Sequence, residues 1–263
     1  MSIVICTDLD GTLLDKQGRI HPMDKEILET RRDLQIILAT GRPLHSVKRA
    51  FQKNGMFLDS PLPFTQVLVN GSVTYAPGEV LRDYFPFTPT VGEQLIELTH
   101  CYPQVTAWLY CVDDVYMRYP NEFSQGVHER LDMATLPFVE GARDPRFSKL
   151  VCISEESDLL REVGGRAADL PVEISYGLGV LFEVTPKGVN KGNGVLSVLP
   201  ALRNGTRIFA AGDDENDLPL LKLAEKSFCP QSANPLLLEA VDQVINKAGR
   251  GLLAPILERA VVT

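Results

Sequence analysis

The sequence opens with a short apolar segment that ends in two carboxylates, and this pattern limits the possible folds more than any other. Ile3-Val4-Ile5 is an apolar run, and Asp8, Asp10 and Gly11 follow it. Such a run is typical of a strand buried on both faces of a parallel sheet. Two like charges one residue apart repel each other unless a cation lies between them. The structural alternative is an Asp-Gly turn, in which Asp10 caps the turn and Gly11 supplies a positive φ angle.

The composition predicts an ordinary soluble globular protein. Of the 263 residues, 44% are hydrophobic and 23% are charged, and the net charge is -8. An acidic chain lacks the basic face that nucleic-acid binding requires. No apolar segment is long enough to span a membrane, and no basic region precedes the first apolar run, so we expect neither a membrane segment nor a signal peptide. The five cysteines are scattered, which favours reduced thiols and a cytoplasmic location.

The first and last thirds of the chain alternate between strand and helix patterns. This rhythm predicts βαβ units and therefore a parallel sheet with helices on both faces. The expected strands are residues 3–7, 35–39, 66–69, 207–211, 227–229 and 244–245, and the expected helices are residues 22–34, 43–54, 191–199, 216–224 and 251–259.

The middle of the chain follows a different pattern. Strand patterns succeed one another directly across residues 113–114 and 177–179, which indicates hairpins and antiparallel pairing. We therefore expect an α+β domain inserted into the α/β core. The predicted organisation is a core part at residues 1–83, an insert at residues 84–182 and a second core part at residues 183–263, with Pro or Gly near both joints.

Polar residues follow several of the predicted core strands. Besides Asp8 and Asp10, these are Thr40-Gly41-Arg42, Asn70-Gly71 and Gly212-Asp213-Asp214. Ligands of open parallel sheets bind at the carboxyl ends of the strands. Carboxylates that meet there suit Mg²⁺, a hard cation that prefers oxygen ligands. The sequence therefore predicts a site for a metal ion and a phosphate group at this edge.

A second acidic cluster and one lysine extend this prediction. The segment from Gly212 to Asp217 contains four acidic residues, some of which are explained as favourable charges at a helix N-terminus. Lys191 opens a predicted helix, where the helix dipole disfavours a cation. A surface lysine is the simpler interpretation of Lys191, and Lys187 is a nearby competitor for any functional role.

Taken together, these motifs resemble those of the haloacid dehalogenase superfamily. Asp8-Leu9-Asp10-Gly11-Thr12-Leu13-Leu14 is similar to its first motif and Thr40-Gly41-Arg42-Pro43 to its second. Lys191-Gly192 resembles the third, and the segment from Gly212 to Asp217 resembles the fourth. Asn70-Gly71, Pro186-Lys187-Gly188-Val189 and the insert between the second and third motifs are similar to the Cof-type phosphatases of subfamily IIB. The resemblance implies a Rossmann-like parallel-sheet core with an inserted α+β cap.

The resemblance also implies a role for each motif residue. Asp8 is expected to attack phosphorus and form an aspartyl phosphate, and Asp10 to act as general acid and base. Mg²⁺ is expected to bind an Asp8 oxygen, the Asp10 carbonyl and Asp213, with Asp217 orienting the ligands. The expected phosphate and substrate contacts are Thr40, Gly41, Arg42, Lys191 and Asn216. The candidate substrate contacts in the cap are Trp108, Arg118, Arg130 and Lys149, for each of which a purely structural role is the alternative.

The implied function is a Mg²⁺-dependent phosphatase that acts on small phosphorylated metabolites, above all sugar phosphates. A phosphomutase or phosphotransferase with the same aspartyl phosphate is an alternative, as is a hydrolase of flavin mononucleotide or pyridoxal phosphate. A non-catalytic binding protein that retains the fold is the alternative from another class. The presence of Asp8, Asp10 and Lys191 argues against it.

Overall fold

The computed structural model describes residues 3–31, 33–131, 133–139, 146–177, 179–199 and 206–262. Contacts divide the chain into two compact units. The first comprises residues 1–41, 47–83 and 190–263, and the second comprises residues 42–46 and 84–189. Three sequence-based expectations fall partly outside the described residues: Arg32 in the first helix, Leu178 in the second hairpin turn and the side chain of Arg130.

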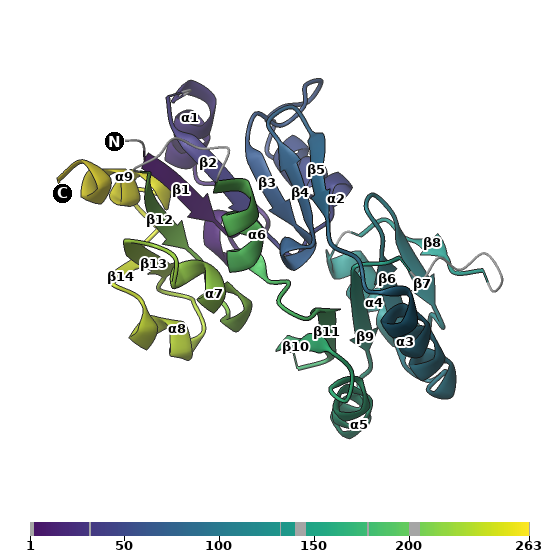
Figure 1. The fold of residues 1–263 in the computed structure, drawn as a ribbon. Coiled ribbons are helices and arrows are strands. Elements are labelled where there is room, and N and C mark those ends of the chain that lie inside the picture. Colours follow the sequence, from purple (N-terminus) through teal and green to yellow (C-terminus); the bar gives the residue numbers. More distant parts are fainter. Residues whose placement is uncertain are drawn as a thin grey trace. The chain divides into compact units, whose positions relative to one another are not determined.

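The first unit contains an eight-stranded sheet in the order β14-β13-β12-β1-β2-β3-β4-β5 (Figure 1). Its strands are β1 (Ile3–Thr7), β2 (Gln35–Ala39), β3 (Thr65–Leu68), β4 (Val73–Ala76), β5 (Val80–Tyr84), β12 (Arg207–Ala211), β13 (Lys226–Pro230) and β14 (Gln243–Ile245). Each pair of neighbours from β14 to β3 is parallel, as the βαβ rhythm predicts. β4 pairs antiparallel with β3, and with β5 it lengthens the sheet beyond the expected strands.

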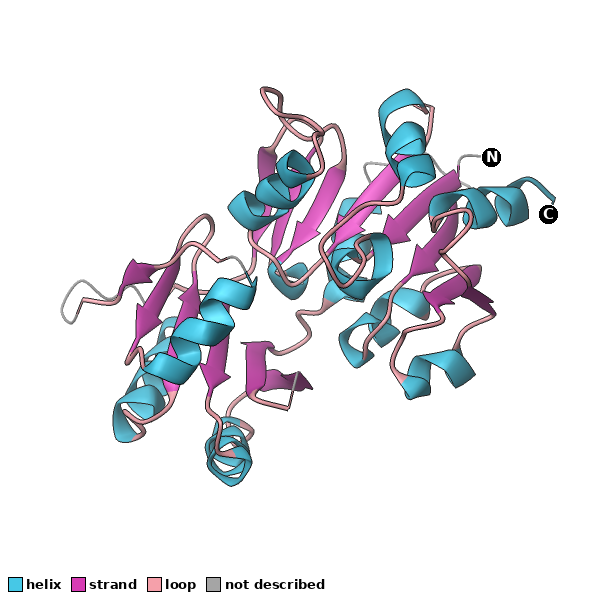
Figure 2. Cartoon of the chain, turned by 180° about the vertical axis from the view of Figure 1, so that it is seen from behind, coloured by secondary structure: helices cyan, strands magenta, loops and turns pink. Residues whose placement is uncertain are grey.

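Helices cover both faces of this sheet (Figures 1 and 2). They are α1 (Pro22–Thr30), α2 (Leu44–Lys53), α6 (Lys191–Val198), α7 (Leu218–Leu221), α8 (Pro235–Ala240) and α9 (Leu253–Val262). One face packs against α6, α7 and α8 through a core that includes Val4, Ile37, Val195, Leu220 and Leu237. None of the helices in the described ranges combines the length and apolar character needed to cross a membrane.

The second unit has its own six-stranded sheet, in the order β10-β11-β9-β6-β7-β8. Its strands are β6 (Thr106–Tyr110), β7 (Val115–Arg118), β8 (Leu136–Pro137), β9 (Lys149–Ile153), β10 (Val172–Gly177) and β11 (Leu181–Pro186), and its helices are α3 (Pro89–Cys101), α4 (Glu122–Leu131) and α5 (Ser157–Ala167). Both expected hairpins, β6 with β7 and β10 with β11, are antiparallel. Side chains from α3, α5 and one sheet face form a separate apolar core, so this unit has the α+β character predicted for the insert.

Several details differ from the sequence-based expectations. The helix expected at residues 22–34 ends at Thr30. The helix expected at residues 216–224 is replaced by a short 3-10 turn, η4 (Glu215–Asp217), followed by the four residues of α7. Beyond the expected joint at residue 182, the chain continues as β11 to Pro186 and stays paired with β10. The second unit therefore extends to residue 189, beyond the expected joint at residue 182.

Candidate active site

The carboxyl end of β1 carries Asp8, which is only 4% exposed. The chain then turns sharply through η1 (Leu9–Leu13), where the helical conformation is broken at Asp10 and Gly11. Gly11 has φ 75°, and a Cβ atom on it would lie 2.1 Å from Asp213 Oδ2. A side chain at this position would therefore be strained and would also collide with a neighbouring acid. The Asp10-Gly11 turn predicted as the structural alternative is therefore present. It also packs directly against Asp213 of the second acidic segment.

Lys191, the first residue of α6, joins two of the acids. Its Nζ lies 2.7 Å from Asp8 Oδ1 and 2.6 Å from Asp217 Oδ1. Its side chain is 2% exposed. A buried ammonium is tolerated only when it is paired and hydrogen-bonded. Lys191 is therefore no surface lysine but the centre of a buried charge cluster.

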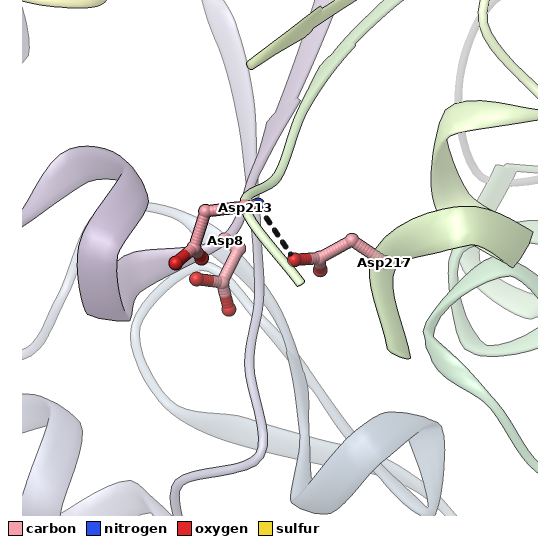
Figure 3. A group of neighbouring side chains, drawn as sticks. All are labelled: Asp8, Asp213 and Asp217. Carbon is pink, nitrogen blue, oxygen red and sulfur yellow. Dashed lines mark hydrogen bonds between the residues drawn. The ribbon is translucent and has the colours of Figure 1, made fainter. Parts of the chain in front are cut away.

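The segment after β12 supplies the other acids. Asp8, Asp213 and Asp217 each place a carboxylate oxygen within 4.8 Å of the others (Figure 3). The Thr12 hydroxyl donates a hydrogen bond of 2.9 Å to Asp213 Oδ1, so the turn after β1 orients this carboxylate. Asp217 Oδ2 accepts the backbone N–H of Asp213 at 2.9 Å and that of Asp214 at 3.2 Å. Asp217 therefore holds the loop that presents Asp213.

The electrostatics of the cluster favour a cation. Burial, assisted by Asp217 and Asp213, raises the pKa of Asp8 well above its usual range, although Lys191 opposes this shift. Burial and then Asp217 raise the pKa of Asp213 to about 6, against the hydrogen bond from Thr12. Burial lowers the pKa of Lys191, but the carboxylates of Asp217 and Asp8 outweigh it and the net change is upward. Three carboxylates and one ammonium leave excess negative charge, and the oxygen donors suit a divalent cation such as Mg²⁺.

The place of Lys191 depends on a close backbone approach. Asn190 caps α6, its side chain accepting the backbone N–H of Asn193. Gly71, in the 3-10 turn η2 (Val69–Gly71) after β3, has φ 99°, and a Cβ atom there would lie 2.2 Å from the Asn190 carbonyl oxygen. The Asn70-Gly71 motif therefore seats the start of α6 at the edge of the sheet.

The remaining predicted residues lie as follows. Asp10 is exposed on the turn after β1. Thr40 is 1% exposed at the carboxyl end of β2, and its backbone N–H donates to the Val67 carbonyl. Arg42 belongs to the short stretch grouped with the second unit and donates to Ser46 Oγ at 3.0 Å.

Asn216 reaches the charge cluster from η4. Its Oδ1 lies 3.4 Å from Lys191 Nζ. The structure thus brings together, within the first unit, Asp8, Lys191, Asp213, Asn216 and Asp217. This cluster lies next to β1 and β12, the two neighbouring strands at which the strand order reverses. Such switch points are where open α/β sheets bind ligands.

Comparison with known proteins decides the family. A family model described as haloacid dehalogenase-like hydrolase matches residues 5–252. The chain belongs to the haloacid dehalogenase-like hydrolases. It is therefore an enzyme, and the resemblance inferred from its motifs is confirmed.

Three relatives illustrate the breadth of the family. An uncharacterized hydrolase of Schizosaccharomyces pombe is 27% identical to this hydrolase, covering 98% of this chain and 90% of the yeast protein. The 5-amino-6-(5-phospho-D-ribitylamino)uracil phosphatase YitU of Bacillus subtilis is 23% identical, and the match covers 93% of this chain and 90% of YitU. A solved structure of the subclass IIB sugar phosphatase BT4131 superposes with a TM-score of 0.77 at 19% identity. The superposition covers 99% of this chain and 98% of BT4131. The fold of this hydrolase is that of the subclass IIB phosphatase.

Two of the candidate substrate contacts in the insert, Lys149 and Arg118, have polar partners within it. Lys149 Nζ lies 2.6 Å from Glu183 Oε1, and the lysine is 1% exposed. Trp108 is fully buried, and Arg118 donates hydrogen bonds to groups of α3. The side chain of Arg130 lies outside the described part of the chain. A role for any of these in substrate binding stays a prediction.

Sequence reasoning missed the part that Thr12 plays. The first motif gives Thr12 no role of its own, yet its hydroxyl donates a hydrogen bond to Asp213, about 200 residues away in the sequence. A threonine inside a turn motif carries no signal that names a distant partner. Only the pairing of β1 with β12 brings the two residues together.

Proposed function

We propose that this hydrolase is a Mg²⁺-dependent phosphatase that acts through an aspartyl-phosphate intermediate. The observation that carries the proposal is the buried Asp8 carboxylate, held by Lys191 at the carboxyl end of β1 beside Asp213 and Asp217. Phosphoryl transfer needs a positioned nucleophile and positive charge near the transferred group, and little else from the protein. This cluster offers both.

In the proposed first step, an oxygen of Asp8 attacks phosphorus. A bond forms between this oxygen and phosphorus while the ester P–O bond breaks and its electron pair leaves with the alcohol oxygen. Lys191 fixes the orientation of the attacking carboxylate through Oδ1. A covalent intermediate divides one difficult displacement into two easier ones.

Asp10 is the proposed general acid and base. Asp10 is an exposed residue two positions after Asp8, so its carboxyl group would be accessible to both the leaving group and water. In the first step it donates a proton to the departing alcohol oxygen. In the second it accepts a proton from the water that attacks phosphorus, which releases inorganic phosphate and restores Asp8.

The non-bridging oxygens of the phosphate group require donors. We assign this role to Lys191, the Thr40 hydroxyl and the Gly41 backbone N–H, with Asn216 beside Lys191. Arg42 is the proposed substrate contact from the stretch grouped with the second unit. These donors would neutralise charge that grows on the equatorial oxygens in the transition state.

Mg²⁺ fits the acidic cluster by the chemistry of its donors. Asp8, Asp213 and the Asp10 carbonyl would hold it. Both oxygens of Asp217 already accept bonds from Lys191 and from two backbone N–H groups, so Asp217 would orient the ligands. When bound, the cation would lower the pKa of Asp8, keep it ionised and reduce its repulsion of an anionic substrate.

For the substrate, we propose small phosphorylated metabolites, with sugar phosphates first. The support is the kinship with a sugar phosphatase and with a phosphatase of a ribityl phosphate. The insert would select among substrates, because the acidic cluster lies wholly in the first unit while the insert folds around its own core. The five free thiols fit a reducing compartment, so we place the enzyme in the cytoplasm.

Phosphate release tests this proposal. Wild type, Asp8→Asn and the control Asp59→Asn, which changes an exposed acid, are assayed on p-nitrophenyl phosphate with Mg²⁺ and with excess chelator. We expect turnover only with Mg²⁺ and only in wild type and the control. Near-normal turnover by Asp8→Asn would refute the covalent route. A panel of sugar phosphates, flavin mononucleotide and pyridoxal phosphate then ranks the substrate classes.

A further inference from the structure

The turn that carries Asp10 is held by a lysine from the far end of the chain. Lys247 follows β14, and its Nζ donates hydrogen bonds to the carbonyl oxygens of Gly11 at 3.2 Å, of Leu14 at 3.1 Å and of Thr12. An ammonium has three N–H donors and no acceptor, so these three carbonyls use its full capacity. Charge-assisted bonds of this kind are stronger than neutral ones. One side chain thus ties down most of the turn.

The segment that carries Lys247 is itself anchored. Asp24 of α1 is fully buried and accepts the backbone N–H groups of Leu252 and Leu253. Gly251, with φ 67°, gives the chain the bend that directs these groups at Asp24. Burial lowers the pKa of Lys247, and the carboxylate of Asp24 opposes this shift. Lys247 therefore extends from a fixed base.

The exposed position of Asp10 makes this anchor important. Asp8 is buried and oriented by Lys191, whereas Asp10 is exposed on the turn, so its position depends on the conformation of that turn. The backbone of Asp10 is non-helical, at φ -73° and ψ 125°, and the left-handed Gly11 follows it. A change in the Gly11 or Thr12 carbonyl direction would rotate the Asp10 side chain away from its place.

We propose that Lys247 is a positioning residue for the general acid and base: its ammonium fixes the turn of residues 11–14 and thereby the place of Asp10. This inference rests on the proposed function, because it assumes that Asp10 exchanges protons with the leaving group and with water. It adds a residue that lies outside all four motifs and more than 230 positions from the turn it holds.

The test uses two substrates that differ in their need for a proton. An alkyl phosphate has a poor leaving group and needs the general acid, whereas p-nitrophenyl phosphate has a leaving group that departs without one. A displacement of about 1 Å at a catalytic group costs up to about 100-fold in rate. We therefore expect Lys247→Met to lower kcat on the alkyl phosphate by about 10- to 100-fold. On the aryl phosphate the loss should be several times smaller, with little change in KM for either substrate.

A matched control and a double variant sharpen the result. Lys25→Met also removes a half-buried lysine that donates to a backbone carbonyl, that of Asn54, and it should change neither rate. In an Asp10→Asn background, Lys247→Met should cause no further loss on the alkyl phosphate, because residues that act through one another are not additive. Lys247→Arg keeps the charge and should recover part of the rate. If circular dichroism shows that Lys247→Met is unfolded, the same two-substrate comparison is made with Lys247→Arg.

Equal losses on both phosphates, or losses that multiply in the double variant, would overturn the role of Lys247. Unchanged rates in a folded Lys247→Met protein would overturn it as well. A wild-type enzyme that hydrolyses neither phosphate would instead overturn the proposed function, and with it the assumption about Asp10.

Discussion

Replacing Asp213 by asparagine should stabilise the metal-free protein while it impairs activity. Burial and then the neighbouring Asp217 raise the pKa of the half-buried Asp213 from its ordinary value of 3.8 to about 6. A group whose pKa rises on folding binds its proton more tightly in the folded state. Ionisation of Asp213 therefore lowers the stability of the folded state. This loss of stability is absent below about pH 3.8, grows as the pH rises to about 6, and has its full value above about pH 6.

The magnitude follows from the same shift. A rise of this size corresponds to about 3 kcal/mol at neutral pH, since each pKa unit is worth about 1.4 kcal/mol. Part of the repulsion is shared with Asp217 and Asp8. We therefore expect Asp213→Asn to raise the free energy of unfolding by about 1–3 kcal/mol at pH 7.5 without metal, and by about half of that at pH 5. An asparagine oxygen can still accept the hydrogen bond from Thr12. Saturating Mg²⁺ should stabilise wild type more than the variant and shrink the difference.

Urea unfolding followed by far-ultraviolet circular dichroism measures this difference. Circular dichroism is preferred because the single tryptophan, Trp108, lies in the second unit and would report on that unit alone. Asp59→Asn is the control, since this acid is exposed. The reasoning fails if Asp213→Asn, in chelator at pH 7.5, is no more stable than wild type. It also fails if the gain is the same at pH 5.

Three further predictions follow from the site. Lys191→Met removes the ammonium group that pairs with the buried Asp8 and Asp217, so urea unfolding without Mg²⁺ should show a free energy of unfolding lower by about 3–5 kcal/mol. Saturating Mg²⁺ should reduce this loss. Gly71→Ala meets the carbonyl of Asn190 and should lower both the melting temperature and kcat, whereas Gly55→Ala, also at positive φ but without a close neighbour, should lower the melting temperature alone. Asp10→Asn should slow the hydrolysis of alkyl phosphates by about 10²–10⁴-fold without unfolding the protein, and a normal rate would exclude it as the general acid.

The core sheet and its acidic edge could be predicted because their signals are local. Each strand from β1 to β3 reads as an apolar run, and the polar residues follow within a few positions of its end. β5 could not be found this way, because its residues Val80–Tyr84 lie at the sheet edge, are largely exposed and show no clear alternation. The single helix expected at residues 216–224 is not formed, because η4 and α7 divide this segment between them.

The contacts within the site were harder to predict than its location. Sequence reasoning could name Asp8 and Lys191, but it gave no means of knowing that Asp217 pairs with the lysine and holds two backbone N–H groups. Lys247 was missed altogether, since a lysine in a loop has neither a pattern nor a neighbour in sequence that reveals its target. Such long-range pairings depend on the tertiary fold.

The central place of β1 has a consequence for how the chain is made. β1 pairs on one side with β2, which is synthesised soon after it, and on the other with β12, which begins about 200 residues later. On the ribosome, the β12 edge of β1 has no native partner until residues 207–211 have emerged, whereas residues 84–189 form a continuous stretch that can fold first. Catalytic competence therefore arises only after the insert has been synthesised, because Lys191, Asp213 and Asp217 all emerge after it.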